Sequence, residues 1–307
     1  MKKILAIMPV SIGGRLTTSS IIDGFKLNDF EVKIFDELKD EDFSKFLKSD
    51  YSYIIGYDFS PVKLKIDYNL KIPCIAYFSD VIQSRTSGVG YKEYFKYLKN
   101  PDIYTFLWDR ELSKEGDYIY FPHFVNCEIY KNFSIPKTDV AFMGRFDTDL
   151  RLNTFIELNE KLPNVTFKWY AIERHYLDAL SRTNKKDIIK KAYSGFIDNE
   201  TDMADAINDC KIAYNINAQG KTSLNYRTMQ VLACERLIIS DERGELDLFN
   251  NIIPVWSDTN DLAQKIKYYL NNFDEYNKIV KKAREIIVKN HNSSICVKKM
   301  LNIIETK

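Results

Sequence analysis

The stretch NINAQGKTSLNYRTMQVLACERLIISDERGELDLF, residues 215–249, contains the pattern that decides the fold. An apolar strand ends near Asn217, a polar loop follows over residues 218–223, and helical periodicity runs from 223 to 234. The short apolar run at 237–240 then predicts a strand that is buried on both faces. A strand, a helix and a second strand in this order form the unit from which parallel α/β sheets are built.

The same alternation extends in both directions from this unit. Further strands are predicted over residues 4–8, 32–35, 53–56, 74–78, 103–108, 140–143, 165–170, 193–197, 212–216 and 252–255. Helices are predicted over residues 17–27, 41–47, 91–98, 149–161, 262–270, 276–287 and 294–304, with Asp258 as the N-cap of the first terminal helix. The segment 122–138 contains two prolines and breaks the pattern, so it is a candidate linker and hinge. We therefore expect an α/β fold of two Rossmann-like domains, residues 1–130 and 131–290, facing each other across a cleft.

Composition limits the possible functions. A length of 307 residues suits two domains, and the net charge of +1 argues against a broad nucleic-acid surface. Five cysteines without a C-x-x-C pair, and only three histidines, argue for free thiols and against a metal centre. The opening MKKILAIMPV predicts a first strand rather than a signal peptide, and no apolar run is long enough to span a membrane. We expect a cytoplasmic protein.

A glycine and an arginine follow the first predicted strand of each half. In SIGGRLTTSS, residues 11–20, the pair Gly13–Gly14 and Arg15 precede a helix whose N-terminal amides suit an anion. In FMGRFDTDLR, residues 142–151, Gly144 and Arg145 occupy the equivalent place. Each loop is a candidate phosphate site, since open α/β sheets bind ligands beyond the carboxyl ends of their strands. The alternatives are a tight turn without a ligand and a solvated surface arginine.

The stretch at 215–249 supplies a third candidate site. The amides that open its helix, at Ser223, Leu224 and Asn225, are donors for a phosphate. Arg227 and Gln230 are three residues apart, so they lie on one side of the helix. Two further candidates, Asp241 and Glu245, come after the strand that follows. The alternative for Glu245 is a structural role as a carboxylate at the start of a helix.

This third stretch resembles the C-terminal signature of GT-B glycosyltransferases. More narrowly, it is similar to the spore-maturation-type (CgeB-like) branch of the group 1, family 4-like transferases, which carries a run close to N-x-R-T-x-E-x-x-A-C-G followed by S/T-D and E-x-F. The matching residues are Asn225, Arg227, Thr228, Gln230, Ala233, Cys234, Ser240, Asp241, Glu245 and Phe249. Gly144–Arg145, the segment FPHFVNCEIYKNF and the closing helices up to His291 also fit, and the likeness is clearest over residues 101–307.

Three positions depart from that signature. Gln230 replaces a glutamate that commonly holds the donor ribose, although an amide can still donate and accept hydrogen bonds. Glu235 replaces a glycine, and Thr222 stands where related enzymes carry a second glutamate.

The resemblance implies a metal-independent hexosyltransferase without a cofactor, which retains the anomeric configuration. Its donor would be a nucleoside diphosphate sugar, most often of UDP type, and its acceptor a glycan, lipid-linked or protein group in surface glycan biosynthesis, with no nucleic acid and at most peripheral membrane contact. Arg145 and Arg227 would stabilise the leaving diphosphate. The base would lie near Tyr193, Phe196 and Ile197, and the acceptor near Gly13–Arg15 and Asp80, for which a capping role is the alternative. The last helix, within residues 291–307, would pack back on the first domain.

Two other functions fit the same sequence. A sugar-nucleotide epimerase of the same fold would use carboxylates and histidines on the sugar itself. A non-catalytic sugar-nucleotide-binding or scaffold protein is favoured by the loss of the glutamate at Gln230. Slow release of nucleoside diphosphate from a donor would indicate a transferase, binding without turnover a scaffold, and a free epimerised nucleotide-sugar an epimerase.

Overall fold

The computed structural model describes residues 1–40, 42–78, 91–116, 118–217 and 220–306. The chain forms two compact units, and each unit is assembled from segments that are not consecutive. Unit 1 comprises Met1–Asn126, Gln219–Tyr226 and Lys289–Lys307, and unit 2 comprises Cys127–Ala218 and Arg227–Val288. Each unit has a parallel sheet and a hydrophobic core of its own, as strand–helix alternation in the sequence predicts.

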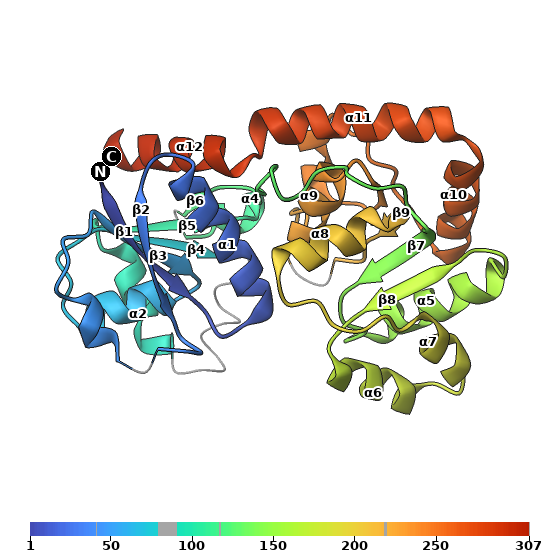
Figure 1. The fold of residues 1–307 in the computed structure, drawn as a ribbon, viewed down its shortest axis with the longest axis horizontal. Coiled ribbons are helices and arrows are strands. Elements are labelled where there is room, and N and C mark those ends of the chain that lie inside the picture. The colour runs from blue at the N-terminus through green and yellow to red at the C-terminus, as the bar shows by residue number, and fades with distance from the viewer. Residues whose placement is uncertain (41, 79–90, 117, 218–219, 307) are drawn as a thin grey trace. The chain divides into compact units, whose positions relative to one another are not determined.

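Unit 1 contains a six-stranded parallel sheet (Figure 1) in the order β2-β1-β3-β4-β5-β6. Its strands are β1 (Lys3–Met8), β2 (Glu31–Asp36), β3 (Tyr53–Tyr57), β4 (Cys74–Phe78), β5 (Ile103–Leu107) and β6 (Ile119–Tyr120). Every residue of β3 and β4 is buried, which explains why both segments are almost entirely apolar. The strand order reverses between β1 and β3.

The C-terminal helix completes this first unit. Its helices are α1 (Ile12–Lys26), α2 (Ser60–Asp67), α4 (Arg110–Lys114) and α12 (Ser293–Thr306), with 3-10 turns η1 (Phe43–Phe46), η2 (Tyr91–Glu93) and η3 (Phe95–Lys99). Val297 and Met300 of α12 are fully buried in the core of unit 1. The side-chain amide of Asn28, just beyond α1, donates to the carbonyl of Ser294 at 2.9 Å. The last helix therefore packs against elements from the beginning of the chain.

Unit 2 contains a four-stranded parallel sheet in the order β10-β9-β7-β8. Its strands are β7 (Thr138–Met143), β8 (Phe167–Tyr170), β9 (Cys210–Tyr214) and β10 (Leu237–Ile239). Its helices are α5 (Asp149–Lys161), α6 (Glu173–Arg182), α7 (Lys186–Ala192), α8 (Glu200–Asn208), α9 (Tyr226–Ala233), α10 (Thr259–Asn271) and α11 (Phe273–Asn290), with a 3-10 turn η4 (Gly244–Phe249). β7 pairs with β8 on one side and with β9 on the other, so the strand order reverses between β7 and β9.

Several local predictions are confirmed in detail. Helix α5 covers residues 149–161, and the hydroxyl of Thr148 accepts from the amide of Arg151 at 3.3 Å as its N-cap. Asp258 caps α10 by accepting from the amides of Asn260 and Asp261 at 2.8 and 3.0 Å. The five cysteines are buried free thiols, as their odd number and wide spacing predicted.

Other predicted elements have a different secondary structure from the one expected. The expected strands at 193–197 and 252–255 each make only a single β-bridge. The first is interrupted by Gly195, whose φ of 91° leaves the extended region, and the second contains Pro254, which has no N–H for a ladder. The segments 41–47 and 91–98, expected as α-helices, contain short 3-10 turns where they are described.

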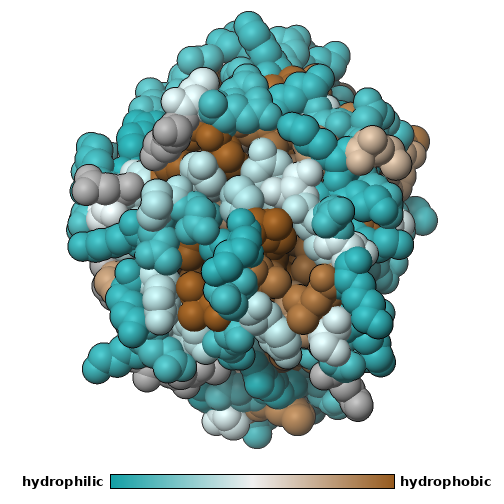
Figure 2. All heavy atoms as spheres, turned by 90° about the vertical axis from the view of Figure 1, so that its left-hand side faces the viewer, coloured by the Kyte–Doolittle hydropathy of each residue, from teal (hydrophilic) through white to brown (hydrophobic). Residues whose placement is uncertain are grey.

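Among the helices of the described ranges, none is both long and apolar enough to cross a bilayer. Figure 2 shows a mainly hydrophilic face on which hydrophobic side chains form separate patches.

Candidate functional site

The carboxyl edge of the unit 2 sheet gathers three loops. Because β7, β9 and β10 are parallel, residues 144–148, 215–217 and 240–243 all leave the sheet at the same edge. The strand order reverses between β7 and β9, and the carboxyl ends of two such strands form the crevice where open α/β sheets bind ligands. The candidate donor site therefore lies at this edge of unit 2.

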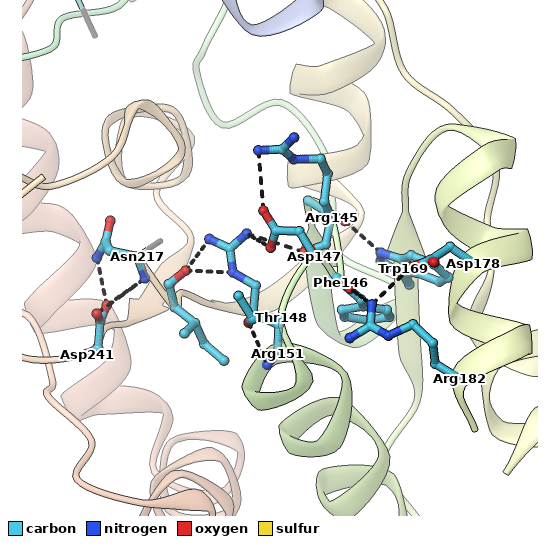
Figure 3. A network of polar contacts seen from close by, with 12 residues as sticks. Arg145, Phe146, Asp147, Thr148, Arg151, Trp169, Asp178, Arg182, Asn217 and Asp241 are labelled. Carbon is cyan, nitrogen blue, oxygen red and sulfur yellow. Dashed lines mark hydrogen bonds and ion pairs between the residues drawn. The ribbon is translucent and has the colours of Figure 1, made fainter. Parts of the chain in front are cut away.

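Polar contacts hold these three loops together (Figure 3). Arg151 of α5 donates from Nε to the carbonyl of Ile216 at 3.0 Å and from Nη1 to Oδ1 of Asp147 at 2.8 Å. Asp241 accepts from Nδ2 of Asn217 at 2.6 Å. The loop after β9 is thus bonded on one side to the loop after β7 and on the other to the loop after β10.

Arg145 is the arginine of this edge whose charge remains accessible. Its side chain is 51% exposed, and Nη2 lies 3.3 Å from Oδ2 of Asp147. Asp147 also pairs with Arg151, whose side chain is only 12% exposed. The two guanidinium groups share one carboxylate, and a guanidinium fork such as the accessible one of Arg145 suits phosphate oxygens.

The backbone around Arg145 is held by contacts with β8 and α6. Trp169 of β8 donates its indole N–H to the carbonyl of Gly144 at 2.8 Å. Its ring stacks on Phe146 with centroids 4.2 Å apart. Arg182, at the end of α6, donates to the carbonyl of Phe146 and pairs with Asp149 at 2.6 Å. The loop 144–146 is therefore held in place before any ligand arrives, as a preorganised anion site requires.

The residues expected near a nucleotide base lie beyond α7. Tyr193 stacks on Tyr176 with ring centroids 4.2 Å apart and donates its hydroxyl to the carbonyl of Ala171 at 3.2 Å. Phe196 is 45% exposed, whereas Ile197 is buried. Of the three predicted residues, Phe196 presents the largest accessible apolar surface.

Gln230 and Arg227 of α9 form a bonded pair. Nη1 of Arg227 donates to Oε1 of Gln230 at 2.6 Å, and Nε2 of Gln230 donates to the hydroxyl of Tyr130 at 2.5 Å. Gln230 is fully buried, so both ends of its amide serve protein groups. In this structure Gln230 orients Arg227, and contact with a donor ribose stays a prediction.

The loop before α9 corrects one expectation. The amide of Ser223, predicted to meet the donor diphosphate, donates to Oδ2 of Asp109 at 3.1 Å, within unit 1. Ser223 and Leu224 are almost completely buried, and Asn225 is half-buried. A carboxylate that is distant in sequence accepts the hydrogen bond that this amide, at a helix N-terminus, would otherwise donate to a ligand.

The first glycine-rich stretch is also different from its prediction. Gly13 and Gly14 belong to α1, which begins at Ile12, rather than to a loop before a helix. Arg15 donates to both oxygens of Asp36, at 2.8 and 2.7 Å. The Arg15 hydrogen bonds hold the pKa of Asp36 at about 2, although partial burial opposes them. Arg15 is therefore engaged in a bidentate pair inside unit 1, while Asp80 lies outside the described residues.

Of the two acidic candidates after β10, Asp241 is bonded to neighbouring protein groups and Glu245 is buried. Asp241 receives the bonds from Asn217 described above and also pairs with Arg243 at 2.9 Å. Glu245 is 1% exposed at the start of η4. Asp241 thus helps to shape the edge of the sheet, and a direct role for either carboxylate in donor binding stays a prediction.

The D-T-D sequence at 147–149 is used for structure. Asp147 pairs with two arginines, Thr148 caps α5, and Asp149 pairs with Arg182. Across the part of the chain that the structure describes, no group of three or more His, Cys, Asp or Glu side chains is arranged to hold a metal ion. Within this segment, Thr148 caps a helix and both aspartates are paired with arginines.

The sequence did not indicate two residues whose contacts hold loops in place, Arg182 in unit 2 and Asp109 in unit 1. Arg182 ends α6, a helix that was not predicted, and nothing near it in sequence indicates that it meets Phe146. Asp109 lies two residues beyond the end of β5 and caps α4, so its place after a strand was a usable signal. Its contact with residues 221–223 was not foreseeable.

Residues 153–302 match a protein family described as "Glycosyl transferase-like". A search of curated protein sequences gave no match.

Solved structures resemble the chain over its full length. Sucrose-phosphate synthase from Thermosynechococcus elongatus is 12% identical with a TM-score of 0.73, covering 100% of this chain and 99% of that one. HepE from Anabaena, solved with UDP and glucose, is 10% identical with a TM-score of 0.74 and full coverage of both chains. An α-glucosyltransferase solved with UDP-glucose and DNA is 16% identical with a TM-score of 0.72 and 99% coverage of both. The chain therefore has the α/β fold of the GT-B glycosyltransferases, with a parallel sheet in each unit.

Proposed function

We propose that this protein is a glycosyltransferase whose donor, a nucleoside diphosphate sugar, binds at the carboxyl edge of the unit 2 sheet. The observation that carries the proposal is the accessible guanidinium of Arg145 on a loop fixed by Trp169 and Arg182. The match of residues 153–302 to a glycosyltransferase-like family supports it, as do similar folds solved with UDP and with UDP-glucose.

The proposed chemistry is electrostatic. The bond between the anomeric carbon of the sugar and the diphosphate oxygen breaks, and its electron pair stays on that oxygen. An acceptor hydroxyl forms the new bond to the anomeric carbon, and its proton passes to the leaving diphosphate. Arg145, together with Arg227 as oriented by Gln230, would stabilise the charge that develops on the leaving diphosphate.

The finer features belong to the same proposal. We infer a metal-independent reaction because guanidinium groups supply the positive charge and the carboxylates of D-T-D are engaged with arginines. Retention of the anomeric configuration, a hexosyl donor of UDP type and a glycan, lipid-linked or protein acceptor follow from the resemblance of the α9 region. Phe196 would contact the nucleotide base, since it is the exposed aromatic residue among those predicted there.

A nucleotide screen tests the proposal directly. Thermal unfolding is followed in the presence of UDP, GDP, TDP and CMP, because a ligand that binds only the folded protein raises its apparent stability. We expect one nucleoside diphosphate to raise the Tm, and Arg145→Ala to weaken its binding about tenfold, which is the loss of about 1.4 kcal/mol. Arg227→Ala should weaken it as well.

A matched arginine provides the control. Arg174 is exposed on α6. Burial is the main cause of the lowered pKa of His175, and the charges of Arg174 and Arg145 both lower it further. Arg174→Ala removes the same charge from the same region and should leave nucleotide affinity within about twofold of the parent, the scale of an ordinary surface substitution. Equal losses of nucleotide affinity in Arg174→Ala and Arg145→Ala would mean that only the overall positive charge matters. Arg145 would then have no specific role in binding the donor.

Turnover separates a transferase from a binding protein. The nucleotide-sugar that corresponds to the binding nucleotide should be hydrolysed slowly without an acceptor. Release of nucleoside diphosphate at a rate lost in Arg145→Ala is the expected result. Tight binding without any release, across donors and acceptors, would contradict an enzymatic function.

A further inference from the structure

A buried carboxylate of unit 1 gathers amides from two separate segments. Asp109 lies between β5 and α4 and is completely inaccessible to solvent. Its Oδ1 accepts from the amides of Glu111 and Leu112, both at 3.0 Å, as the N-cap of α4. Two bonds of this kind are what an ordinary N-cap makes.

The second oxygen of Asp109 is used differently. Oδ2 accepts from three consecutive amides, those of Lys221 at 2.6 Å, Thr222 at 2.9 Å and Ser223 at 3.1 Å. The hydroxyl of Thr222 also donates to Oδ1 at 3.3 Å. Consecutive amides that converge on one anion form a nest, and here the anion belongs to the protein.

The carboxylate is held in its charged form. Burial acts to raise the pKa of Asp109, but the amides of Leu112, Thr222, Lys221 and Ser223 outweigh it and keep the pKa below its usual value. A charged acceptor makes each of these bonds stronger than a neutral one would. The attachment of the loop to Asp109 is therefore strong at neutral pH.

Other contacts attach the same loop to unit 1. The hydroxyl of Tyr226 lies 2.5 Å from Oγ of Ser20 on α1, and its ring packs edge-on against His123 with centroids 5.5 Å apart. Lys221 forms an exposed ion pair with Glu115. Residues 220–226 thus belong to unit 1, although the preceding strand β9 and the rest of α9 belong to unit 2.

Gly220 is fitted to this arrangement. Its φ is 78°, a conformation that favours glycine. A Cβ at this position would lie 2.8 Å from Oδ2 of Asp109 and 2.2 Å from Oγ of Ser223. The loop can therefore approach the carboxylate closely only with glycine at its start.

We propose that Asp109 is a positioning residue for the donor site: by holding residues 221–223, it fixes the start of α9 and so the placement of Arg227. The inference rests on the proposed function. Arg227 follows the anchored loop by four residues, at the second position of α9, and Gln230 fixes the far end of its side chain. Asp109 touches no substrate in this proposal and acts only through the loop.

A matched pair of variants tests the proposal. Asp109→Ala removes the cap of α4 and the anchor of the loop, whereas Asp258→Ala removes only a two-amide cap, that of α10. The dissociation constant of UDP, or of the nucleoside diphosphate that binds the parent, is measured by calorimetry well below the melting temperature. Hydrogen exchange at residues 221–223 is measured on the same samples.

We expect Asp109→Ala to raise the dissociation constant at least tenfold and to remove exchange protection at residues 221–223. Asp258→Ala should match the parent in both measurements, since a lost cap alone lowers the melting temperature without changing the affinity of the folded protein. Asp109→Ala with an unchanged or lower dissociation constant would overturn the positioning role and leave the proposed function intact. A parent that binds no nucleoside diphosphate would instead overturn the proposed function and this inference together.

Gly220→Ala disturbs the same contact by changing the loop instead of the carboxylate. It strains the loop while Asp109 and its cap on α4 stay in place, so it serves even where Asp109→Ala does not fold. A rise in the dissociation constant of at least fivefold is expected. Parent-like affinity in Gly220→Ala, together with lost exchange protection at residues 221–223, would argue against any dependence of the site on this loop.

Discussion

The first strand of each unit is followed by glycine and arginine, but the two stretches are used in opposite ways. In unit 1, Gly13 and Gly14 lie in the first turns of α1, and Arg15 is bonded to both oxygens of Asp36. In unit 2, Gly144 and Arg145 remain in a loop because α5 begins only at Asp149, after the cap at Thr148. Arg145 keeps half of its surface exposed, whereas Arg15 keeps about a fifth.

The difference shows what turns a short glycine–arginine pattern into a candidate binding site. The decisive features are where the helix begins and whether a carboxylate of a neighbouring strand is within reach. Asp36 ends β2, which lies directly beside β1 in the sheet. In unit 2, Asp147 is shared between Arg145 and Arg151, so Arg145 has no carboxylate to itself. We therefore expect substitutions in the first stretch to change stability and those in the second to change binding.

The largest contrast between the units should appear on acidification. His123 and His291 are buried in unit 1, and burial lowers their pKa from 6.5 to about 3 and about 4. Since both folded-state pKa values are depressed, the unfolded chain takes up protons first, and stability is lost as the pH falls below about 6.5. Between pH 8 and pH 5 the two groups should cost unit 1 about 4 kcal/mol of unfolding free energy.

Urea unfolding at a series of pH values checks this expectation. Trp108 reports on unit 1 when Trp169 and Trp256 are replaced by phenylalanine. His123→Gln should reduce the pH dependence near pH 5 by about 1.4 kcal/mol per pH unit, the contribution of one proton. His175→Gln in unit 2 is the control and should leave the Trp108 transition unchanged. A transition that does not move between pH 7 and pH 5 would contradict the prediction.

The next largest effect separates the two arginines. Arg15→Ala leaves the nearly buried carboxylate of Asp36 without its bidentate partner, which should lower the free energy of unfolding of unit 1 by about 3 kcal/mol at pH 7. Arg145→Ala removes an exposed side chain and should lower stability by less than about 0.5 kcal/mol. Denaturant titration of both variants measures the difference. Equal losses of stability would mean that the two arginines have equivalent structural roles.

The smallest effect concerns the two glycines. A Cβ at Gly14 would lie 2.6 Å from Oγ of Ser11 and 2.7 Å from Cδ1 of Tyr57, whereas a Cβ at Gly144 would meet only the Phe142 ring at 3.6 Å. Gly14→Ala should therefore destabilise unit 1 by about 2 kcal/mol, and Gly144→Ala should have little effect on unit 2. Thermal unfolding of the two variants provides the measurement. A stable Gly14→Ala protein would show that α1 does not need its close approach to β3.

Much of the unit 2 site could be predicted because its signals are local. The strand that ends at Met143, the cap at Thr148 and the start of α5 follow from neighbouring residues, and so the position of Arg145 beyond a strand end was correct. The spacing of Arg227 and Gln230 on one helix likewise led to a contact that the structure contains. The partners of Ser223 and Arg15 could not be predicted in this way, because Asp109 is 114 residues from Ser223 and Asp36 is 21 residues from Arg15.

By itself the sequence determined the α/β class, the division into two sheets and the loops that end their strands, because apolar periodicity and capping residues act over a few positions. The tertiary structure alone decided which of these groups are already satisfied. Arg15, Gln230 and the amide of Ser223 have the same chemistry as free binding groups, but each meets a protein partner brought close by the packing of distant segments. Whether a polar group binds a ligand or stabilises the fold depends on that partner, and chain folding places it at distances that no local pattern records.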